Sequence, residues 1–400
     1  MSTNPSYSSR TPISSPLPKI VVMGLGGGGC NAINRMIESG MQGVTFVACN
    51  TDAQVLATNL AQNKIQLGPK ATRGLGAGGI PEIGEAAAEE SYRDLAAIMD
   101  GAEMVFLTAG MGGGTGTGAI SIAAKVAKAV GAVTIAIVTK PFSFELGKRQ
   151  KNCEIGLQKL RQYADTLIAI PNDKLIEVAP RDLPLEMAFT LADDVLRQGV
   201  QGISELITET GLINVDFSHI KSVMQRGGGS LMAIGTGSGP DRVKQAIDKA
   251  LHHPLLDEID LYSATNMIAN FTGSANLSFR DVTDALQILQ EASGYHADII
   301  PGVITDPRME DRVQLILIVT GIGNKPGEMR EEKIHNLPFE QKTMPDESFS
   351  WNTQKTNTDN TMVFHPVNEI NEMDYINKVE PENNLDVPAF LRRRSYNQNK

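Results

Sequence analysis

The sequence predicts an α/β protein: a doubly wound, mainly parallel sheet, then a long connecting helix, a second α+β domain and a disordered C-terminal tail. Two observations carry this prediction. Between residues 20 and 170, short apolar runs typical of buried strands alternate with helical patterns. Glycine-rich segments follow several of these runs. Such alternation favours right-handed crossovers, and ligands bind these sheets at the carboxyl ends of the strands.

The strands of the first half are expected where short apolar runs are bounded by glycine or polar residues. These runs cover residues 19–23, 44–49, 104–108, 133–138 and 166–170. Helices are expected over residues 31–39, 81–99 and 119–126, and Pro81 suits the first position of its helix. A long helical pattern then runs from residue 185 to about residue 207.

Composition limits the classes of protein that the chain can form. Its 400 residues are 41% apolar, which suits two or three domains with sizeable cores. The net charge of −10 argues against a protein built to coat nucleic acid. No apolar stretch approaches the roughly 20 residues of a membrane span. The Ser- and Pro-rich residues 1–18 lack an apolar signal core, so we expect a disordered tail on a cytoplasmic protein with reduced thiols.

Residues 110–118, with the sequence GMGGGTGTG, lie between a predicted strand and a predicted helix. Glycines allow several backbone N–H groups to turn toward one point, and a helix start adds free N–H groups and a positive dipole end. This combination predicts a phosphate cradle, to which Thr115 and Thr117 can add hydroxyl donors. The chain has no G-x-x-x-x-G-K-[ST] pattern. Phosphate charge must therefore be met by backbone amides, a metal ion and residues from elsewhere.

Two further glycine-rich segments support the same interpretation. Residues 24–29 satisfy the G-x-G-x-x-G dinucleotide pattern, and Asp52 follows the next strand where a Rossmann protein has its ribose-binding acid. An NAD-binding enzyme is therefore a rival hypothesis. Residues 74–79, GLGAGG, form the third segment, which a plain surface loop would also explain. Three glycine segments in one domain favour a single phosphate chain that is held from several sides.

The segment GGGTGTG at residues 112–118 resembles the signature loop of the tubulin/FtsZ family. The chain resembles the bacterial FtsZ branch of that family over about residues 19–323, and again at its extreme C-terminus. The resemblance implies a GTPase that polymerises into filaments and organises cell division. It also implies GTP or GDP as the bound nucleotide and Mg²⁺ as its metal ion.

The resemblance implies which residues bind the phosphates and the sugar. Glu145 and Arg149 are expected to contact the sugar and the nucleotide, although an isolated E-x-x-x-R pattern more often forms an ion pair on a helix surface. Cys30 is expected to be a small filling residue rather than a reactive thiol. The expected phosphate-binding residues are Gly27, Gly28, Gly29, Cys30, Asn31, Ala77, Gly78, Gly79, Gly112, Gly113, Gly114, Thr115, Gly116, Thr117 and Gly118.

Recognition of the base is expected on the long helix. Phe189 can stack on a purine, although ordinary core packing would also explain it. A carboxylate can accept hydrogen bonds from guanine N1–H and the 2-amino group, which adenine does not offer together. Asp193 and Asp194 both lie one turn from Phe189. The residues leave open which of the two reads guanine, and the resemblance favours Asp194.

Residues 211–220 resemble the synergy loop, which in the family docks on the nucleotide of the next subunit. Asn214 and Asp216 match the family, but His219 stands where the family has a second acidic residue. These three residues are the candidate catalytic set, and no metal ligand is assigned. An imidazole changes charge near neutral pH and is a poor ligand for a hard cation. We therefore hypothesise that hydrolysis is reduced or more pH-sensitive, with filament formation retained. A tolerated exposed histidine is the alternative.

The second half divides into an α+β domain, a linker and a terminal peptide. Residues 325–384 are acidic and lack an apolar period, which indicates a disordered linker. Residues 385–394 return to apolar and basic character and resemble the family peptide that binds membrane-tethering adaptors and division regulators. Strands are expected at residues 231–235, 267–272, 299–303 and 314–320, and helices at residues 241–252 and 281–292. The expected domains are residues 1–18, 19–184, 185–210, 211–324, 325–384 and 385–400.

Together these features predict a cytoplasmic GTPase, concentrated at mid-cell, that self-assembles into the bacterial division ring. GTP is expected to be hydrolysed between consecutive subunits, with Asn214 and Asp216 of one copy acting on the GTP of the next. The alternatives are a family relative that acts mainly as a structural filament with weak hydrolysis, which His219 favours, and a Rossmann NAD-binding enzyme.

Overall fold

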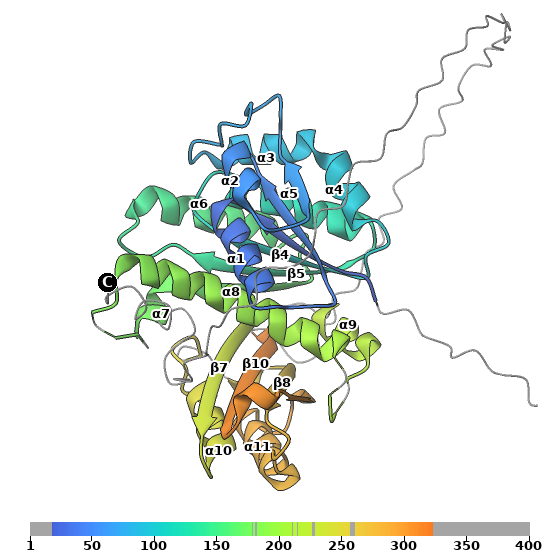
Figure 1. The fold of residues 1–400 in the computed structure, drawn as a ribbon, viewed down its shortest axis with the longest axis vertical. Coiled ribbons are helices and arrows are strands. Elements are labelled where there is room, and N and C mark those ends of the chain that lie inside the picture. The colour runs from blue at the N-terminus through green and yellow to red at the C-terminus, as the bar shows by residue number, and fades with distance from the viewer. Residues whose placement is uncertain are drawn as a thin grey trace, which may run out of the picture. The chain divides into compact units, whose positions relative to one another are not determined.

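In the described part of the chain, ten strands form one sheet in the order β3-β2-β1-β4-β5-β6-β7-β10-β8-β9 (Figure 1). The computed structural model describes residues 18–322 except Val178, Arg181, Thr210, Asn214, 226–228 and 257–260, together with the side chain of Leu146. All of these residues lie in the first of the chain's two units, Met1–Glu331. The predictions for residues 1–17, for the linker 325–384 and for the terminal peptide 385–400 lie outside the described residues.

The first half is the parallel α/β layer that the apolar runs predict. Its strands pair in parallel, and their odd and even residues face two different cores, one on each side of the sheet. In β1, Ile20 and Val22 face one core while Val21 and Met23 face the other. The strands are β1 (Ile20–Leu25), β2 (Thr45–Asn50), β3 (Asn63–Gln66), β4 (Met104–Gly110), β5 (Val133–Lys140) and β6 (Thr166–Pro171).

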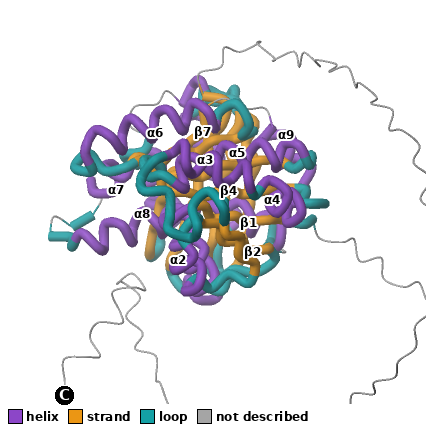
Figure 2. Tube along the Cα trace, turned by 90° about the horizontal axis from the view of Figure 1, so that it is seen from above, coloured by secondary structure: helices purple, strands orange, loops and turns teal. Residues whose placement is uncertain are grey.

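Helices cover both faces of this layer, as a doubly wound sheet requires. Figure 2 shows α3 and α5 on one side of the strands and α2 and α8 on the other. The core of the first side takes residues from α3, α4, α5 and α6, and that of the second from α1, α2, α7, α8 and α9. The helices of the first half are α1 (Gly26–Glu38), α2 (Ala53–Thr58), α3 (Pro81–Glu90), α4 (Tyr92–Met99), α5 (Thr115–Ala129), α6 (Leu146–Leu160) and α7 (Asn172–Glu177).

The long helix α8 (Leu185–Thr208) joins the two halves, and Figure 1 shows it in green between β4 and β5 on one side and β7, β10 and β8 on the other. Its buried stripe packs on the first-half core and on the strands of the second half. The elements of the second half are α9 (Phe217–Gln225), β7 (Gly229–Ser238), α10 (Arg242–Leu251), η1 (Leu261–Ser263), β8 (Asn266–Gly273), α11 (Phe279–Ala292), β9 (Asp298–Thr305), η2 (Pro307–Met309) and β10 (Arg312–Ile322).

The second half continues the same sheet with a mixed pattern. Strand β10 is antiparallel to both β7 and β8, whereas β8 and β9 are parallel. Only a short parallel pairing, Leu167 with Gly229 and Ile168 with Ser230, links β6 to β7. Helices α10 and α11 cover one face with a third core, and α8 covers the other. The predicted α+β character is confirmed.

Three local predictions differ from the structure. Helices α1 and α5 begin at Gly26 and Thr115, inside the segments expected to be loops. The helix expected over residues 81–99 is two helices that meet at Ser91, whose buried hydroxyl accepts a hydrogen bond from Gly68 N–H at 3.0 Å. This hydrogen bond attaches Ser91 to the loop after β3, at the point where α3 ends and α4 begins. The short elements β3 and α2 were not expected, because their residues are too few to show a period.

Within the described ranges, no helix is both long enough and apolar enough to cross a bilayer.

Candidate active site

Two glycine turns pack against each other where β1 and β4 end. Gly26 has φ of +71°, and a Cβ on it would lie 2.7 Å from the backbone N of Gly116. A Cβ on Gly116 would in turn lie 3.1 Å from the carbonyl oxygen of Leu25. Only glycine allows both the left-handed backbone and this approach. The starts of α1 and α5 therefore meet at the point where the strand order changes direction, which is where doubly wound sheets bind ligands.

The glycine segment at residues 74–79 packs against the segment at residues 110–118. A Cβ on Gly114 would lie 2.8 Å from Ile80 N and 2.9 Å from Ala77 Cβ. The segment is also attached to the end of β2, because Gly76 N–H donates to Thr51 O at 3.2 Å. The hydroxyl oxygens of Thr51 and Thr115 lie 2.6 Å apart. The three glycine-rich segments, residues 24–29, 74–79 and 110–118, thus lie together at one edge of the molecule, which we call the glycine edge.

Some of these glycines border open space and others are packed. A Cβ added to Gly27, Gly78, Gly79 or Gly113 would meet nothing within 4 Å. In contrast, Gly116 and Gly118 are buried within the first turn of α5, and so is Thr117. The first N–H groups of a helix have no partner inside that helix. The open glycines and the two helix starts therefore provide a cradle of backbone N–H groups that fits a chain of phosphates.

Two predicted binding residues turn their side chains inward. Thr117 is 2% exposed, and its hydroxyl oxygen accepts a hydrogen bond from Gly112 N–H at 2.8 Å. Cys30 is fully buried, and its Sγ donates to Cys49 O at 3.7 Å. Burial raises the pKa of the Cys30 thiol to about 11. The thiol is thus inert packing, and Cys30 can contribute only its backbone to the site, whereas the neighbouring Asn31 is exposed.

Glu145 and Arg149 form the ion pair that their spacing alone predicts. Arg149 donates through Nη1 to Glu145 Oε2, and Phe142 N–H donates to Glu145 Oε1 at 2.9 Å. The Glu145 side chain is 9% exposed, whereas that of Arg149 is 57% exposed. The pair stands at the start of α6, just after the carboxyl end of β5. Both side chains are at the predicted edge, with the guanidinium toward solvent.

An aromatic cluster stands beside this pair. Phe142 is buried and stacks on Phe144 with ring centres 5.1 Å apart. The ring centres of Phe189 and Phe142 lie 5.3 Å apart in a T-shaped arrangement, with 83° between the two ring planes. Phe189 stays 40% exposed and Phe144 53% exposed. Rings that serve only as core packing are normally buried, so this exposure suits stacking against a flat base.

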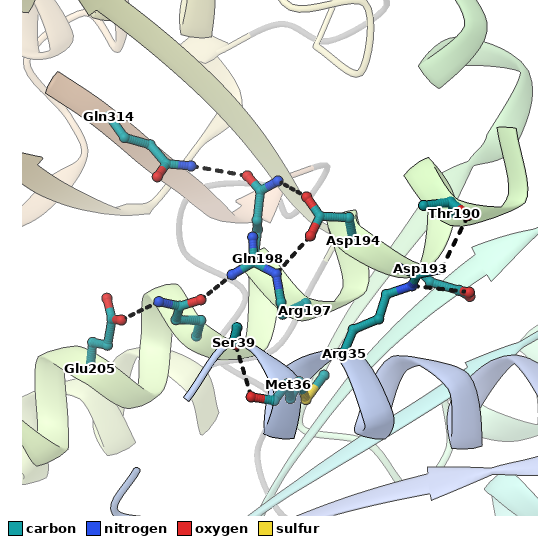
Figure 3. A network of polar contacts seen from close by, with 11 residues as sticks. Arg35, Met36, Ser39, Thr190, Asp193, Asp194, Arg197, Gln198, Glu205 and Gln314 are labelled. Atoms are coloured by element: carbon teal, nitrogen blue, oxygen red, sulfur yellow. Dashed lines mark hydrogen bonds and ion pairs between the residues drawn. The ribbon is translucent and has the colours of Figure 1, made fainter. Parts of the chain in front are cut away.

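The two acids near Phe189 have different partners, as Figure 3 shows. Asp193 Oδ2 lies 3.5 Å from Arg35 Nε of α1. Asp194 Oδ1 accepts from Arg197 Nε at 2.7 Å, and its Oδ2 accepts from Gln198 Nε2 at 2.6 Å. Burial raises the pKa of Asp193 to about 6. Each carboxylate oxygen can accept more than one hydrogen bond, so either acid can still accept donors from a guanine.

The candidate catalytic residues lie at the opposite edge of the sheet. The last residue of α8, Thr208, contacts Gly43 just before β2, so α8 ends at the amino ends of the strands. The end of α9 lies there too, because Thr166, the first residue of β6, donates to Met224 O at 2.7 Å. Helix α8 has 24 residues and so spans about 36 Å. Asp216 and His219, which follow it, are far from the glycine edge of the same molecule.

The loop after α8 is attached to β9. Leu212 N–H donates to Val303 O at 2.9 Å, and Ile213 forms a bridge with Val303. Asp216 precedes the first turn of α9, and its Oδ1 accepts from Ser218 N–H at 3.0 Å. Hydrogen bonds from the Ser218 side chain and from its backbone N–H hold the pKa of the Asp216 carboxyl below its usual range. Asn214 lies outside the described residues.

Sequence reasoning missed residues that connect these parts. Asn152 of α6 donates through Nδ2 to Gly112 O at 3.3 Å and to Gly79 O at 3.4 Å, and so joins two glycine segments. Thr51 connects the start of α5 to the end of β2, and Arg35 connects the last turn of α1 to α8. No local pattern marks these residues, because each acts on partners far away in the sequence.

Among the described residues, no group of three or more His, Cys, Asp and Glu side chains could hold a metal ion. A cation at the glycine edge would therefore take most of its ligands from phosphate oxygens and water, as Mg²⁺ commonly does.

The fold and this edge define a phosphate-binding α/β protein without the common lysine-containing loop. Residues 19–180 match the Tubulin/FtsZ family GTPase domain, and residues 228–323 match the FtsZ family C-terminal domain. The chain therefore belongs to the tubulin/FtsZ family and carries its GTPase domain, so the NAD-binding alternative is not retained.

Solved structures agree with this membership. One similar structure is an empty FtsZ dimer from M. jannaschii, which is 43% identical with a TM-score of 0.75. The match covers 77% of this chain and 90% of that one. CetZ2 from Haloferax volcanii, a GTPγS-bound protofilament, matches 77% of this chain and 94% of its own at 19% identity and a TM-score of 0.66, which shows the shared fold.

Proposed function

We propose that this protein is a GTPase that polymerises in a GTP-dependent manner and forms the bacterial division ring. GTP is hydrolysed between consecutive subunits, and Asn214 and Asp216 of one copy act on the GTP of the next. One observation carries this proposal. The glycine edge and the loop with Asp216 stand at opposite ends of α8, so one molecule alone lacks a complete site. Head-to-tail stacking of copies brings the two ends together.

The nucleotide is held by the first half of the chain in this proposal. The open glycines and the starts of α1 and α5 hold the phosphates through backbone N–H groups. Glu145 and Arg149 contact the sugar, Phe189 stacks on the base, and Asp194 or Asp193 reads guanine. The exposure of Phe189 and Arg149 supports these roles. When bound, Mg²⁺ offsets phosphate charge through the phosphate oxygens.

The remaining roles rest on the resemblance and on sequence composition. The terminal residues 385–394 bind membrane-tethering adaptors and division regulators, and residues 325–384 link them to the folded part. The domain boundaries stay as the sequence predicts them. The protein acts in the cytoplasm and concentrates at mid-cell.

The shared site has a simple test. Phosphate release per molecule is measured over a range of protein concentrations, in parallel with GTP-dependent sedimentation. A shared site requires the rate per molecule to rise with polymer. Equal rates per molecule in dilute monomer and in polymer would contradict the proposal.

A mixing experiment makes the test more specific. Asp216→Ala subunits keep the glycine edge but lack the acid, and Gly114→Ala subunits keep the acid but have a disturbed edge. Neither variant alone should release phosphate at the wild-type rate. The mixture should be faster than the average of the two variants, because Asp216 of one subunit then meets the GTP of the other. Strict averaging in co-sedimented polymers would argue for sites within single molecules.

The family relative with weak turnover is the second candidate. The replacement of an acidic residue by His219 favours it. Sedimentation with GTP but negligible phosphate release would favour this candidate. Sedimentation together with phosphate release would favour the polymerising GTPase.

A further inference from the structure

His219 has a carboxylate partner that the loop itself does not supply. Its Nε2 lies 3.3 Å from Oδ2 of Asp298, which is 79 residues further along the chain. Each of the two side chains is 49% exposed, so the pair lies on the surface and can contact a second molecule. His219 thus stands where the family has an acidic residue, and the carboxylate of Asp298 lies next to its imidazole ring.

The backbone on both sides of this pair is well anchored. His219 N–H donates to Asp216 O at 3.0 Å in the first turn of α9. Asp298 is the first residue of β9, where it pairs with Asn266, and its N–H donates to Thr265 O at 3.0 Å. The contact therefore joins two separate elements. By contrast, the exposed pair of His252 Nδ1 and Asp248 Oδ1, 3.2 Å apart, lies at the C-terminal end of the single helix α10.

We propose that His219 and Asp298 form a base-and-carboxylate pair that takes over the work of the absent acid at the subunit interface. This inference rests on the proposed function, since it needs GTP of the next copy beside this loop. Asp298 accepts the proton on Nε2, which leaves the lone pair on Nδ1 free to accept one. The charge of Asp298 then stabilises the imidazolium that results. Asp298 is a positioning residue, because it acts through His219.

The chemical step balances without any further reactant. The oxygen of water forms a bond to the γ-phosphorus, and the bond from that phosphorus to the β,γ-bridging oxygen breaks. The electron pair of the broken bond stays with GDP. The proton of the water passes to Nδ1 of His219 and returns to solvent after phosphate leaves. Asp216 keeps its negative charge, because the side chain and the backbone N–H of Ser218 both donate to the carboxylate.

The experiment measures phosphate release per sedimented subunit at saturating GTP, in full-length protein. His219→Ala should lower this rate by about 100-fold, the size of a typical general-base contribution. Asp298→Asn should lower it less, because the amide oxygen still accepts the Nε2 proton but lacks the charge. The double variant should be no slower than His219→Ala alone, because Asp298 acts only through the imidazole. Added imidazole should restore part of the rate of His219→Ala, which a purely structural role would not allow.

The exposed pair in α10 provides matched controls. His252→Ala and Asp248→Asn each remove one member of a surface His–Asp pair outside the loop, and both should keep the wild-type rate. Sedimentation with GTP shows whether each variant still folds and assembles.

Separate outcomes overturn separate statements. An unchanged rate in His219→Ala polymers would overturn the base role, and additive losses in the double variant would overturn the pairing. In both cases the shared site would still stand. A wild-type rate per molecule that does not depend on concentration would remove the shared site, and the role of this pair with it.

Discussion

Arg35 of α1 and Asp193 of α8 form a largely buried ion pair, with 3.5 Å between Nε and Oδ2 (Figure 3). Arg35 also donates through Nη2 to Thr190 Oγ1 at 3.1 Å. The Nε atom itself is buried without a hydrogen bond, so the pairing compensates only partly for the loss of water. The pair connects the helix after the first glycine turn to the helix that carries Phe189. Helix α8 thus contacts the last turn of α1, the helix that begins at the glycine edge.

The first prediction concerns the pH dependence of stability. Burial raises the pKa of Asp193 from an ordinary 3.8 to about 6, so the folded state binds its proton more tightly than the unfolded state does. The resulting stabilisation is complete below the unfolded pKa and is lost as the pH rises through about 6. The whole loss is about 3 kcal/mol, of which about 1 kcal/mol falls between pH 5 and pH 8.

Urea unfolding of wild type and of Asp193→Asn checks this. From about pH 5 to about pH 8, wild type should lose about 1 kcal/mol relative to the variant. Asp284→Asn, which removes an acid that is 67% exposed, should follow wild type. A wild-type loss no larger than that of Asp193→Asn would contradict the assignment.

The second prediction concerns Gly114. A methyl group there would lie 2.8 Å from Ile80 N, so Gly114→Ala must displace residues 77–80 or the start of α5. We expect GDP affinity to fall by at least about tenfold, equal to about 1.4 kcal/mol. Isothermal titration with GDP measures this. Phe279→Ala, which changes an exposed ring in the second half, is the control, and it should bind as wild type does.

The third prediction concerns Asn152, which donates to the carbonyl oxygens of Gly79 and Gly112. Asn152→Ala loses two long hydrogen bonds. Asn152→Asp should be worse, because a carboxylate repels both carbonyl oxygens and an incoming phosphate. The expected order of GDP affinity is wild type, then Ala, then Asp. Equal affinity for the two variants would mean that Asn152 does not face the glycine segments in solution.

The fourth prediction concerns the exposed ring of Phe189. Phe189→Ala should weaken GTP binding by about 1–3 kcal/mol, the range for stacking of an aromatic side chain on a base. Phe189→Tyr should retain most of the affinity. Phe279→Ala removes a phenyl ring that is 77% exposed in the second half and should leave binding unchanged. Retained GTP affinity in Phe189→Ala would assign the ring to packing against Phe142.

The fifth prediction concerns the departure at His219. His219→Asp restores an acidic residue in the first turn of α9, and we expect faster phosphate release per polymerised subunit. The comparison is made at about pH 6 and at about pH 8, because imidazole changes charge in this range and a carboxylate does not. Equal rates for wild type and variant at both values would discard the hypothesis that His219, even with Asp298 beside it, is a weaker substitute for the acidic residue of the family.

Much of the fold could be predicted because its signals are local. Strands β1, β4 and β5 are continuous apolar runs, as strands buried on both faces must be. The limits of α1 and α5 could not be predicted in the same way. Glycine disfavours helices, yet Gly26 and Thr115 begin helices because the two turns must pack closely against each other. Tertiary contact overrides local preference there.

The sequence by itself marked the glycine segments, Phe189 and the acids of the long helix as candidates, because short spacing rules and side-chain chemistry are local properties. Only the tertiary structure decided that Asp298 contacts His219 and that Asn152 joins two glycine segments. It also decided that the nucleotide-binding residues and the candidate catalytic residues lie at opposite ends of α8. These contacts join residues far apart in the chain. No periodicity encodes them, since they depend on how the elements pack in space.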